Sequence, residues 1–229
     1  MVAAVVMAAG LGTRMRPLTE RWAKPVLPVD GEPVIAHLLR ELASAGCGDV
    51  TVVVGHLGDQ VRRVCESLEL GLHVRYAVQA EPTGSWGAVA AADVEPPYVL
   101  VGADTVFSAG DIARFSAAFE VSGADGALAL RPVSRDESPR NRVRVRDALV
   151  VRLPDDEPTH AGAPLWVIGA PLGRFVAEPR GGPPYELITA FQGAIDAGTR
   201  IAGIEIGPTR DLTTPADLLL ENFPYLRHL

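Results

Sequence analysis

A glycine-rich segment near the start of the sequence carries the residues best suited to chemistry. It reads Gly10-Leu-Gly-Thr-Arg-Met-Arg-Pro17 and follows an apolar run from Val2 to Ala9. Glycines at the end of a buried strand let backbone N–H groups turn toward a phosphate. Arg14 and Arg16 follow at once, and Lys24 lies a few residues further on. Three cations around such a loop predict a polyphosphate site, although a plain surface turn flanked by arginines would share this pattern.

Other common reaction centres are absent from the sequence. The dinucleotide fingerprint needs a third glycine where Met15 stands, and the Gly-Lys-Ser/Thr of a P-loop does not occur. The five histidines show no metal-ligand spacing, and no Ser-His-Asp arrangement is legible. Two cysteines, Cys47 and Cys65, are too few for a disulfide framework or a four-thiolate zinc site. We expect both to be free thiols.

Several segments together resemble the sugar-1-phosphate nucleotidyltransferases, in particular the short glucose-1-phosphate thymidylyl- and uridylyltransferases. The longest match covers Ala8 to Thr19 and continues through Lys24-Pro-Val-Leu-Pro-Val29. Further matches are Gly31 to Ile35, Gln79 to Ala88, Val101 to Asp104 and Asp211 to Pro215. The resemblance implies transfer of a nucleotidyl group from a nucleoside triphosphate to a sugar 1-phosphate, with release of pyrophosphate.

The resemblance also implies a role for each matched residue of the loop. Arg14 would hold the departing pyrophosphate, because its fork of donors fits phosphate oxygens. Lys24 would lie against the α-phosphate, where negative charge develops. The rest of the nucleotide-binding loop would act through its backbone and comprises Ala9, Gly10, Gly12 and Thr13.

Two aspartates match the metal carboxylates of the family. Asp104 follows an expected buried strand, at the edge where ligands gather in open α/β sheets. Asp211 matches the second carboxylate, and hard oxygen ligands of this kind suit Mg²⁺. Thr209 and Thr213 replace the family's tryptophan and glycine here. A turn or capping role for Asp211 therefore stays open beside the metal role.

Gln79 and Gly84 match the base pocket. A side-chain amide offers both a donor and an acceptor to the imide edge of uracil or thymine. A glycine lets the backbone approach the base closely. Because relatives that use UTP or dTTP carry this pair, we expect a pyrimidine triphosphate. Guanylyltransferases share the Glu-Pro-x-Gly portion, so GTP remains an alternative.

The acceptor side departs from the family. Glu157 stands where a lysine usually meets the sugar's phosphate, and a carboxylate there would repel a phosphate. Arg144 and Arg152 are candidates to replace that lysine, and Glu186 is a further candidate for binding the acceptor. Two other interpretations stay open. One is the same chemistry with GTP or CTP and a heptose phosphate, a cyclitol phosphate or phosphocholine; the other is a regulatory nucleotide-binding domain without turnover.

The elements that must position these residues follow from hydrophobic patterning. Apolar runs predict strands at residues 2–9, 50–54, 74–78, 98–101, 126–133, 143–146, 149–153, 165–168 and 201–206. Amphipathic spacing predicts helices at residues 34–45, 57–68 and 186–197, and another that begins at Pro215 with Thr214 as its N-cap. This alternation predicts an α/β fold: a doubly wound, mostly parallel sheet with a smaller acceptor-binding β lobe. We expect one domain over 1–229, with a nucleotide-binding half (1–125) and an acceptor-binding half (126–229).

Composition limits the partners. The 229 residues are 48% hydrophobic and 21% charged, as in a globular protein with one substantial core. The net charge of −7 argues against nucleic acid, which favours a basic surface. No apolar run reaches the roughly 20 residues needed to cross a bilayer, so no membrane role is expected. We expect a cytoplasmic monomer or homodimer that binds Mg²⁺, a nucleoside triphosphate and a sugar 1-phosphate.

Overall fold

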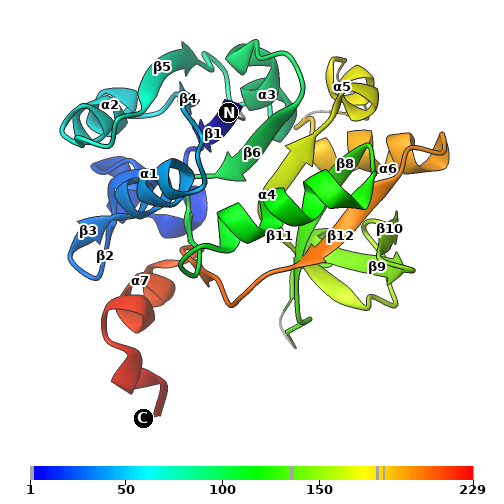
Figure 1. Ribbon diagram of the computed structural model, residues 1–229. Coiled ribbons are helices and arrows are strands. Elements are labelled where there is room, and N and C mark those ends of the chain that lie inside the picture. The colour runs from blue at the N-terminus through cyan, green and yellow to red at the C-terminus, as the bar shows by residue number, and fades with distance from the viewer. Residues whose placement is uncertain (1–2, 135–136, 179–180, 183, 229) are drawn as a thin grey trace.

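The computed structural model describes residues 3–134, 137–178, 181–182 and 184–228 (Figure 1). Its centre is a nine-stranded sheet with the strand order β5-β4-β1-β6-β11-β8-β12-β10-β9. The strands of the first half are β1 (Ala3–Ala8), β4 (Asp49–Val54), β5 (His73–Val78) and β6 (Tyr98–Gly102). Those of the second half are β8 (Gly126–Arg131), β9 (Arg142–Arg146), β10 (Leu149–Arg152), β11 (His160–Ile168) and β12 (Ile201–Glu205).

The first half of the sheet is parallel. β1 pairs in parallel with β4 on one side and with β6 on the other, and β4 pairs in parallel with β5. Continuous apolar runs such as Ala4 to Val6 are buried because helices cover both faces of these strands. The carboxyl ends of β1, β4, β5 and β6 therefore meet at one edge, where the glycine-rich loop begins.

The second half departs from the parallel pattern at β11. This strand runs antiparallel to both β6 and β8, while β12 is parallel to β8. β9 and β10 form an antiparallel hairpin at the end of the sheet. β11 is longer than the four residues expected from sequence, because it also pairs with β9 through His160 and Ala161. The sheet is thus continuous across both halves of the chain.

Helices cover the two faces of the sheet. α1 (Val34–Ser44), α2 (Gly58–Glu66) and α4 (Asp111–Ser122) share one apolar cluster with the sheet, and α4 crosses the front in Figure 1. α3 (Ser85–Ala92), α5 (Ala170–Val176) and α6 (Leu187–Asp196) share the cluster on the other face. Helices on both faces of the sheet confirm the predicted α/β class. The sheet itself is mixed rather than mostly parallel: of the neighbouring pairs in the strand order, four are parallel and four are antiparallel, because β11 and the β9–β10 hairpin run against their neighbours. α4 and α5 were not anticipated from the sequence.

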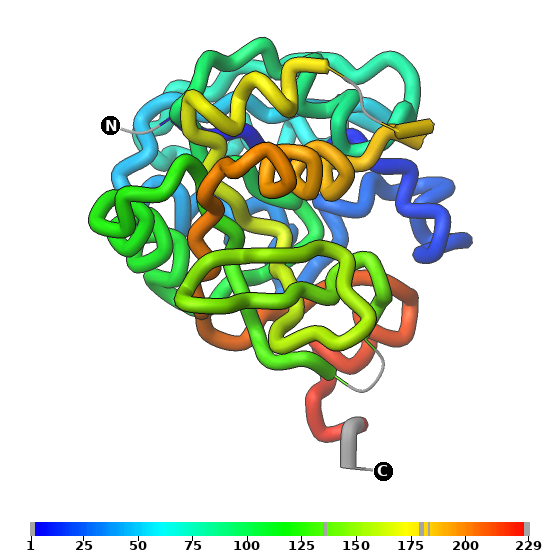
Figure 2. The backbone as a smooth tube through the Cα atoms, turned by 90° about the vertical axis from the view of Figure 1, so that its right-hand side faces the viewer, coloured from blue at the N-terminus to red at the C-terminus, as the bar shows by residue number. Residues whose placement is uncertain are grey.

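Short pairings and a terminal helix complete the fold. β2 (Pro28–Val29) pairs with β3 (Glu32–Pro33), and β7 (Thr105–Val106) pairs with β13 (Arg210–Asp211). α7 (Pro215–Asn222) begins as expected after Thr214, whose backbone N–H donates to the Asp217 carboxylate at 2.6 Å. Figures 1 and 2 both show α7 and the residues after it extending from the lower end of the molecule. None of the described helices is both long and apolar enough to span a membrane.

Candidate active site

The glycine-rich loop leaves the carboxyl end of β1 in a conformation that only glycine adopts without strain. Gly12 has a φ of +61°, and a Cβ there would lie 2.8 Å from the Thr19 side chain. The Thr19 hydroxyl donates to the Gly12 carbonyl at 2.8 Å, which closes the loop on itself. Ala9 is buried at the start of the loop, while Gly10 and Thr13 are exposed. The loop thus presents open backbone at Gly10 above a fixed turn at Gly12.

Arg14 extends from this loop into solvent. It lies in the 3₁₀ turn Thr13–Met15, and the turn is anchored from below by the fully buried side chain of Met15. The Arg14 side chain is exposed and forms no hydrogen bond or ion pair with another described residue. Its guanidinium is therefore available to an anionic ligand.

Lys24 and Asp104 meet across the site. The Lys24 Nζ lies 2.5 Å from Asp104 Oδ2, although the residues are 80 positions apart. The Lys24 side chain is 13% exposed and that of Asp104 is 41% exposed. The ammonium is thus held at the carboxyl edge of β6 while part of the carboxylate faces outward, which brings together two residues singled out from the sequence.

The loop that carries Lys24 is braced by two residues at the start of α2 and just before it. Gln60 accepts from the Ala23 N–H at 2.8 Å and donates to the Arg21 carbonyl at 2.8 Å. The His56 Nε2 lies 2.8 Å from the Thr19 carbonyl. Neither side chain was assigned a role from the sequence, because all three contacts depend on how the loop folds back over α2.

Asp211 also reaches this edge, but its carboxylate is already engaged. β13 pairs with β7 so that Asp211 faces Thr105, the residue after Asp104, and the Leu212 N–H donates to the Asp104 carbonyl at 3.0 Å. The Thr105 hydroxyl donates to Asp211 Oδ1 at 2.6 Å, and Arg131 forms an ion pair with Oδ2. The two aspartates expected to hold a metal are therefore adjacent in the fold, each bonded to a cation.

Asp104 fits a divalent metal ion better than Asp211 does. Asp104 is partly exposed and uses only its Oδ2 in the ion pair with Lys24, whereas both oxygens of Asp211 have partners. Within the described part of the chain, no group of three His, Cys, Asp or Glu side chains is placed to hold a metal ion. A metal at this site would need further oxygen ligands from water or phosphate, as Mg²⁺ commonly has.

Gln79 and Gly84 lie together at the carboxyl end of β5. The Gln79 Nε2 donates to the Gly84 carbonyl at 3.1 Å, which fixes the orientation of the amide. Gly84 has a φ of +102°, and a Cβ there would lie 2.4 Å from the Tyr185 carbonyl oxygen. The Trp86 N–H donates to that same oxygen at 3.0 Å. Gly84 is thus required where the segment before α6 packs against the segment before α3.

Glu186 joins the two halves at this junction. It accepts from the Ser85 hydroxyl at 2.7 Å, and Ser85 Oγ in turn accepts from the Leu187 N–H at 2.9 Å. Figure 2 shows the glycine-rich loop in dark blue and the segment leading into α6 in gold on the same side of the molecule. Glu186 is thus placed near the expected base pocket and is held by Ser85.

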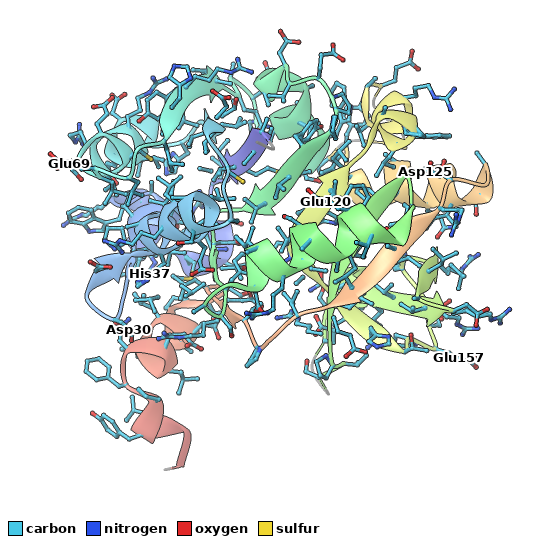
Figure 3. All side chains as sticks on the ribbon, in the orientation of Figure 1. Asp30, His37, Glu69, Glu120, Asp125 and Glu157 are labelled. Atoms are coloured by element: carbon cyan, nitrogen blue, oxygen red, sulfur yellow. The ribbon has the colours of Figure 1, made fainter. Side chains whose placement is uncertain are left out.

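The other acceptor candidates lie at the β9–β10 end of the sheet. Arg144 forms ion pairs with Asp155 at 2.8 Å and Glu157 at 2.9 Å. Arg152 is exposed and faces Arg144 across the hairpin. The Glu157 side chain is 87% exposed and points outward at the edge of the molecule (Figure 3). Arg144 is thus already neutralised by two acids, one of which is Glu157.

Comparison with known proteins shows the family of the chain. The model of the MobA-like NTP transferase domain matches residues 4–177. AglF of Haloferax volcanii, a UTP–glucose-1-phosphate uridylyltransferase, is 29% identical over 227 residues, covering 93% of this chain and 92% of AglF. The CMP-5'-(3-aminopropyl)phosphonate synthase of Streptomyces rubellomurinus is 36% identical over 137 residues, which cover 58% of this chain but only 22% of that protein.

A solved structure shows the same fold over nearly the whole chain. The inositol-1-phosphate CTP transferase from T. maritima has a TM-score of 0.81 at 20% identity, covering 95% of this chain and 91% of that one. The family match extends over most of the chain and includes the glycine-rich loop, Lys24 and Asp104. The chain therefore belongs to the MobA-like NTP transferase family and is a nucleotidyltransferase.

Proposed function

We propose that this nucleotidyltransferase joins a nucleoside triphosphate, UTP or dTTP, to a sugar 1-phosphate and releases pyrophosphate. The observation that carries the proposal is the contact of Lys24 with Asp104 at 2.5 Å beside the glycine-rich loop. It places a cation, a partly exposed carboxylate and open backbone at one edge of the sheet. Phosphoryl chemistry of this kind depends on positioning and charge neutralisation more than on covalent catalysis.

The proposed step is a displacement at the α-phosphorus. A phosphate oxygen of the acceptor bonds to that phosphorus as its bond to the oxygen bridging the β-phosphate breaks, and pyrophosphate leaves. Arg14 would hold the pyrophosphate through its unpaired guanidinium, and Lys24 would stabilise the charge that develops on the α-phosphate. Ala9, Gly10, Gly12 and Thr13 would align the phosphates along the loop.

Enzymes of this family generally depend on a divalent metal ion, and we propose Mg²⁺ here. When bound, it would neutralise and orient the phosphates. Asp104 would hold it through the carboxylate that faces outward. Asp211 matches the family's second metal carboxylate, and its bonds to Arg131 and Thr105 make it the weaker candidate in this arrangement.

Gln79 supports a pyrimidine base. Its Nε2 donates to the Gly84 carbonyl at 3.1 Å and, at a longer 3.5 Å, to the Thr83 hydroxyl, so a ligand would meet the Oε1 and would take the second hydrogen in place of Thr83. A donor beside an acceptor complements the imide edge of uracil or thymine. Named members of the family nevertheless use UTP, dTTP, GTP and CTP. The choice of base is therefore the part of the proposal to test first.

A second candidate keeps the chemistry and changes the substrates: CTP with a different phosphorylated or phosphonylated acceptor. It is favoured by the acceptor side, where Glu157 replaces the usual lysine and Arg144 is bonded to two acids. It is also supported by the 36% identity to a phosphonate synthase that forms a CMP conjugate. Arg152 and Glu186 remain candidates for contact with either kind of acceptor.

Pyrophosphate release tests both candidates. The purified protein is assayed with UTP, dTTP, CTP, GTP and ATP against glucose 1-phosphate, a heptose 1-phosphate, inositol 1-phosphate, phosphocholine and 2-aminoethylphosphonate. We expect UTP or dTTP with a sugar 1-phosphate to give the highest kcat/KM, and Gln79→Glu to weaken use of UTP. A tenfold preference for GTP or ATP would refute the base assignment, and binding without turnover across the panel would point to a regulatory nucleotide-binding domain.

We further propose that the protein acts in the cytoplasm on small molecules, without nucleic acid. Residues 1–125 would bind the nucleotide, and residues 126–229 would bind the acceptor within one domain. A monomer or homodimer is expected, and size-exclusion chromatography with light scattering measures this. A stable tetramer would contradict it.

A further inference from the structure

The carboxylate of Asp211 is enclosed by partners that come from three parts of the chain. Arg131 Nη1 donates to Oδ2, the Thr105 hydroxyl donates to Oδ1 at 2.6 Å, and the Thr209 hydroxyl donates to Oδ2 at 3.3 Å. A carboxylate offers about four acceptor sites, and three of them are used here. The side chain of Asp211 is 26% exposed, so little of it is left open to solvent.

Arg131 makes its shortest ion pair with Asp211. It ends β8, its side chain is 20% exposed, and Nη1 also donates to the Thr209 hydroxyl at 2.8 Å. Its Nη2 lies 3.5 Å from the buried carboxylate of Glu137, whereas its Nε is buried and finds no partner among the described residues. A buried donor without a partner lowers the stability of the fold, so the position of the guanidinium does not satisfy all of its hydrogen-bond donors. The charge on Asp211 is its main short-range partner.

Thr209 is part of this network, and it is also a position at which the sequence departs from the family. It stands where the resembling family has a tryptophan, and its hydroxyl bonds both Arg131 and Asp211. A tryptophan could not supply an oxygen that accepts from one and donates to the other. The residue that differs from the family is thus one of those that bond Asp211.

We propose that Arg131 is a built-in counter-ion that excludes Asp211 from metal coordination. Divalent metal would then be held by Asp104 together with water, and by the triphosphate once it binds, rather than by two carboxylates. The physical reason is charge together with occupied oxygens. The guanidinium repels a cation, and both oxygens of Asp211 already have partners, whereas Asp104 is bonded to Lys24 through Oδ2 alone. The inference rests on the proposed metal- and nucleotide-dependent function, and it assigns Arg131 a positioning role.

Metal affinity of the nucleotide-free protein tests the proposal without an activity assay. Mn²⁺ is titrated into wild-type protein and variants and followed by calorimetry and water-proton relaxation. We expect Arg131→Gln to tighten Mn²⁺ binding by about tenfold, because a nearby positive charge no longer repels the ion. Arg131→Lys keeps the charge and should leave the affinity near the wild-type value. Adding Asp211→Asn to Arg131→Gln should remove the gain.

Single aspartate variants provide a matched pair. Asp104→Asn should abolish Mn²⁺ binding because it removes a ligand. Asp211→Asn should weaken binding by no more than about tenfold, because it removes a nearby charge but no ligand. Equal losses in the two variants, or an unchanged affinity in a folded Arg131→Gln protein, would overturn the proposal. If Arg131→Gln does not fold, the comparison of Asp104→Asn with Asp211→Asn still decides. The two proposals can fail separately. If the metal affinities are as expected but no substrate pair in the panel releases pyrophosphate, the counter-ion role of Arg131 is supported and the proposed reaction is refuted.

Discussion

Lys24 and Arg14 are two cations of the proposed site that differ in burial and in their partners. Lys24 is nearly buried and fixed on Asp104, whereas Arg14 is exposed and unpaired among the described residues. A fixed cation suits a charge that develops at a defined atom. An exposed guanidinium suits a leaving group that must depart into solvent. Their different burial supports different proposed roles for two residues that the sequence treats as similar cations.

Removing either cation should slow turnover. We expect Lys24→Ala and Arg14→Ala each to lower kcat by roughly 10²-fold or more, the loss typical of a removed charge on a transition state. Arg21→Ala is the matched control, because Arg21 is exposed on the same loop and contributes only its carbonyl to the Gln60 contact. Steady-state pyrophosphate release measures all three. Near-normal rates in the first two variants would refute the phosphate assignment.

Gly84 is constrained by backbone rather than by charge. A Cβ there would lie 2.4 Å from the Tyr185 carbonyl oxygen, and its φ of +102° disfavours any L side chain. We expect Gly84→Ala to lower the free energy of unfolding by about 1–3 kcal/mol, because strain and displaced backbone add. Gly182→Ala is the control, since among the described residues, its chain neighbours aside, no atom lies within 4 Å of a Cβ at that position. Urea denaturation should separate the two, and equal stability would contradict the close packing.

Elements of this fold are joined by ion pairs that bring distant segments together. Arg210 in β13 bonds Asp30 in the β2–β3 turn through both terminal nitrogens and Glu221 in α7 through Nε at 2.6 Å. It therefore ties the strand that carries Asp211 to the hairpin and to the last helix. Gln60 joins α2 to the Lys24 loop in a similar way, through hydrogen bonds with two backbone groups.

The link between Arg210 and Asp30 should make stability depend on pH. The hydrogen bonds from Arg210 lower the pKa of Asp30 below 3.8 in the folded protein. The stabilisation is thus fully present above pH 3.8 and is lost as pH falls through the lowered folded pKa. Because Asp30 is 55% exposed, we expect Asp30→Asn to cost only about 0.5–1 kcal/mol at pH 7.

Urea denaturation of wild type and Asp30→Asn between pH 2 and pH 7 checks this dependence. The difference in the free energy of unfolding should shrink as the pH falls below 3.8. Glu69→Gln serves as a control, because Glu69 is exposed and has no hydrogen-bond or ion-pair partner among the described residues. A difference between wild type and Asp30→Asn that stays constant down to pH 2 would show that the carboxylate is not the stabilising group.

The whole molecule buries both of its cysteines in one core. Cys47 and Cys65 are each 4% exposed and belong to the cluster beneath α1 and α2. Burial raises the pKa of both thiols, and that of Cys65 to about 11. The reactive thiolate is therefore scarce and shielded in the folded state, as expected from the sequence for free thiols.

Thiol reactivity should therefore report opening of the whole fold. We expect both cysteines to react with a disulfide reagent at pH 8 orders of magnitude more slowly than in urea, because reaction requires exposure of the core. Val121→Cys provides an exposed control, since Val121 is 87% exposed on α4. Rapid reaction of either native cysteine in the folded protein would show that the core opens locally there.

The sequence by itself determined the parts that depend on local pattern. Apolar runs located β1, β4, β5 and β6, and the glycine spacing located the loop after β1, because these features need only neighbouring residues. The tight turn at Gly12 and the N-cap at Thr214 follow from backbone preferences in the same way. The family resemblance added Lys24 and Asp104, which the fold brings into contact.

Only the tertiary structure decided which groups neutralise each other. Asp211 meets Thr105 across 106 positions and Arg131 across 80, while Arg144 bonds Asp155 and Glu157 instead of remaining free for an acceptor. The antiparallel course of β11, which carries the sheet into its second half, is likewise set by long-range pairing. Such contacts depend on where whole strands end in space, and residue spacing along the chain carries no record of that.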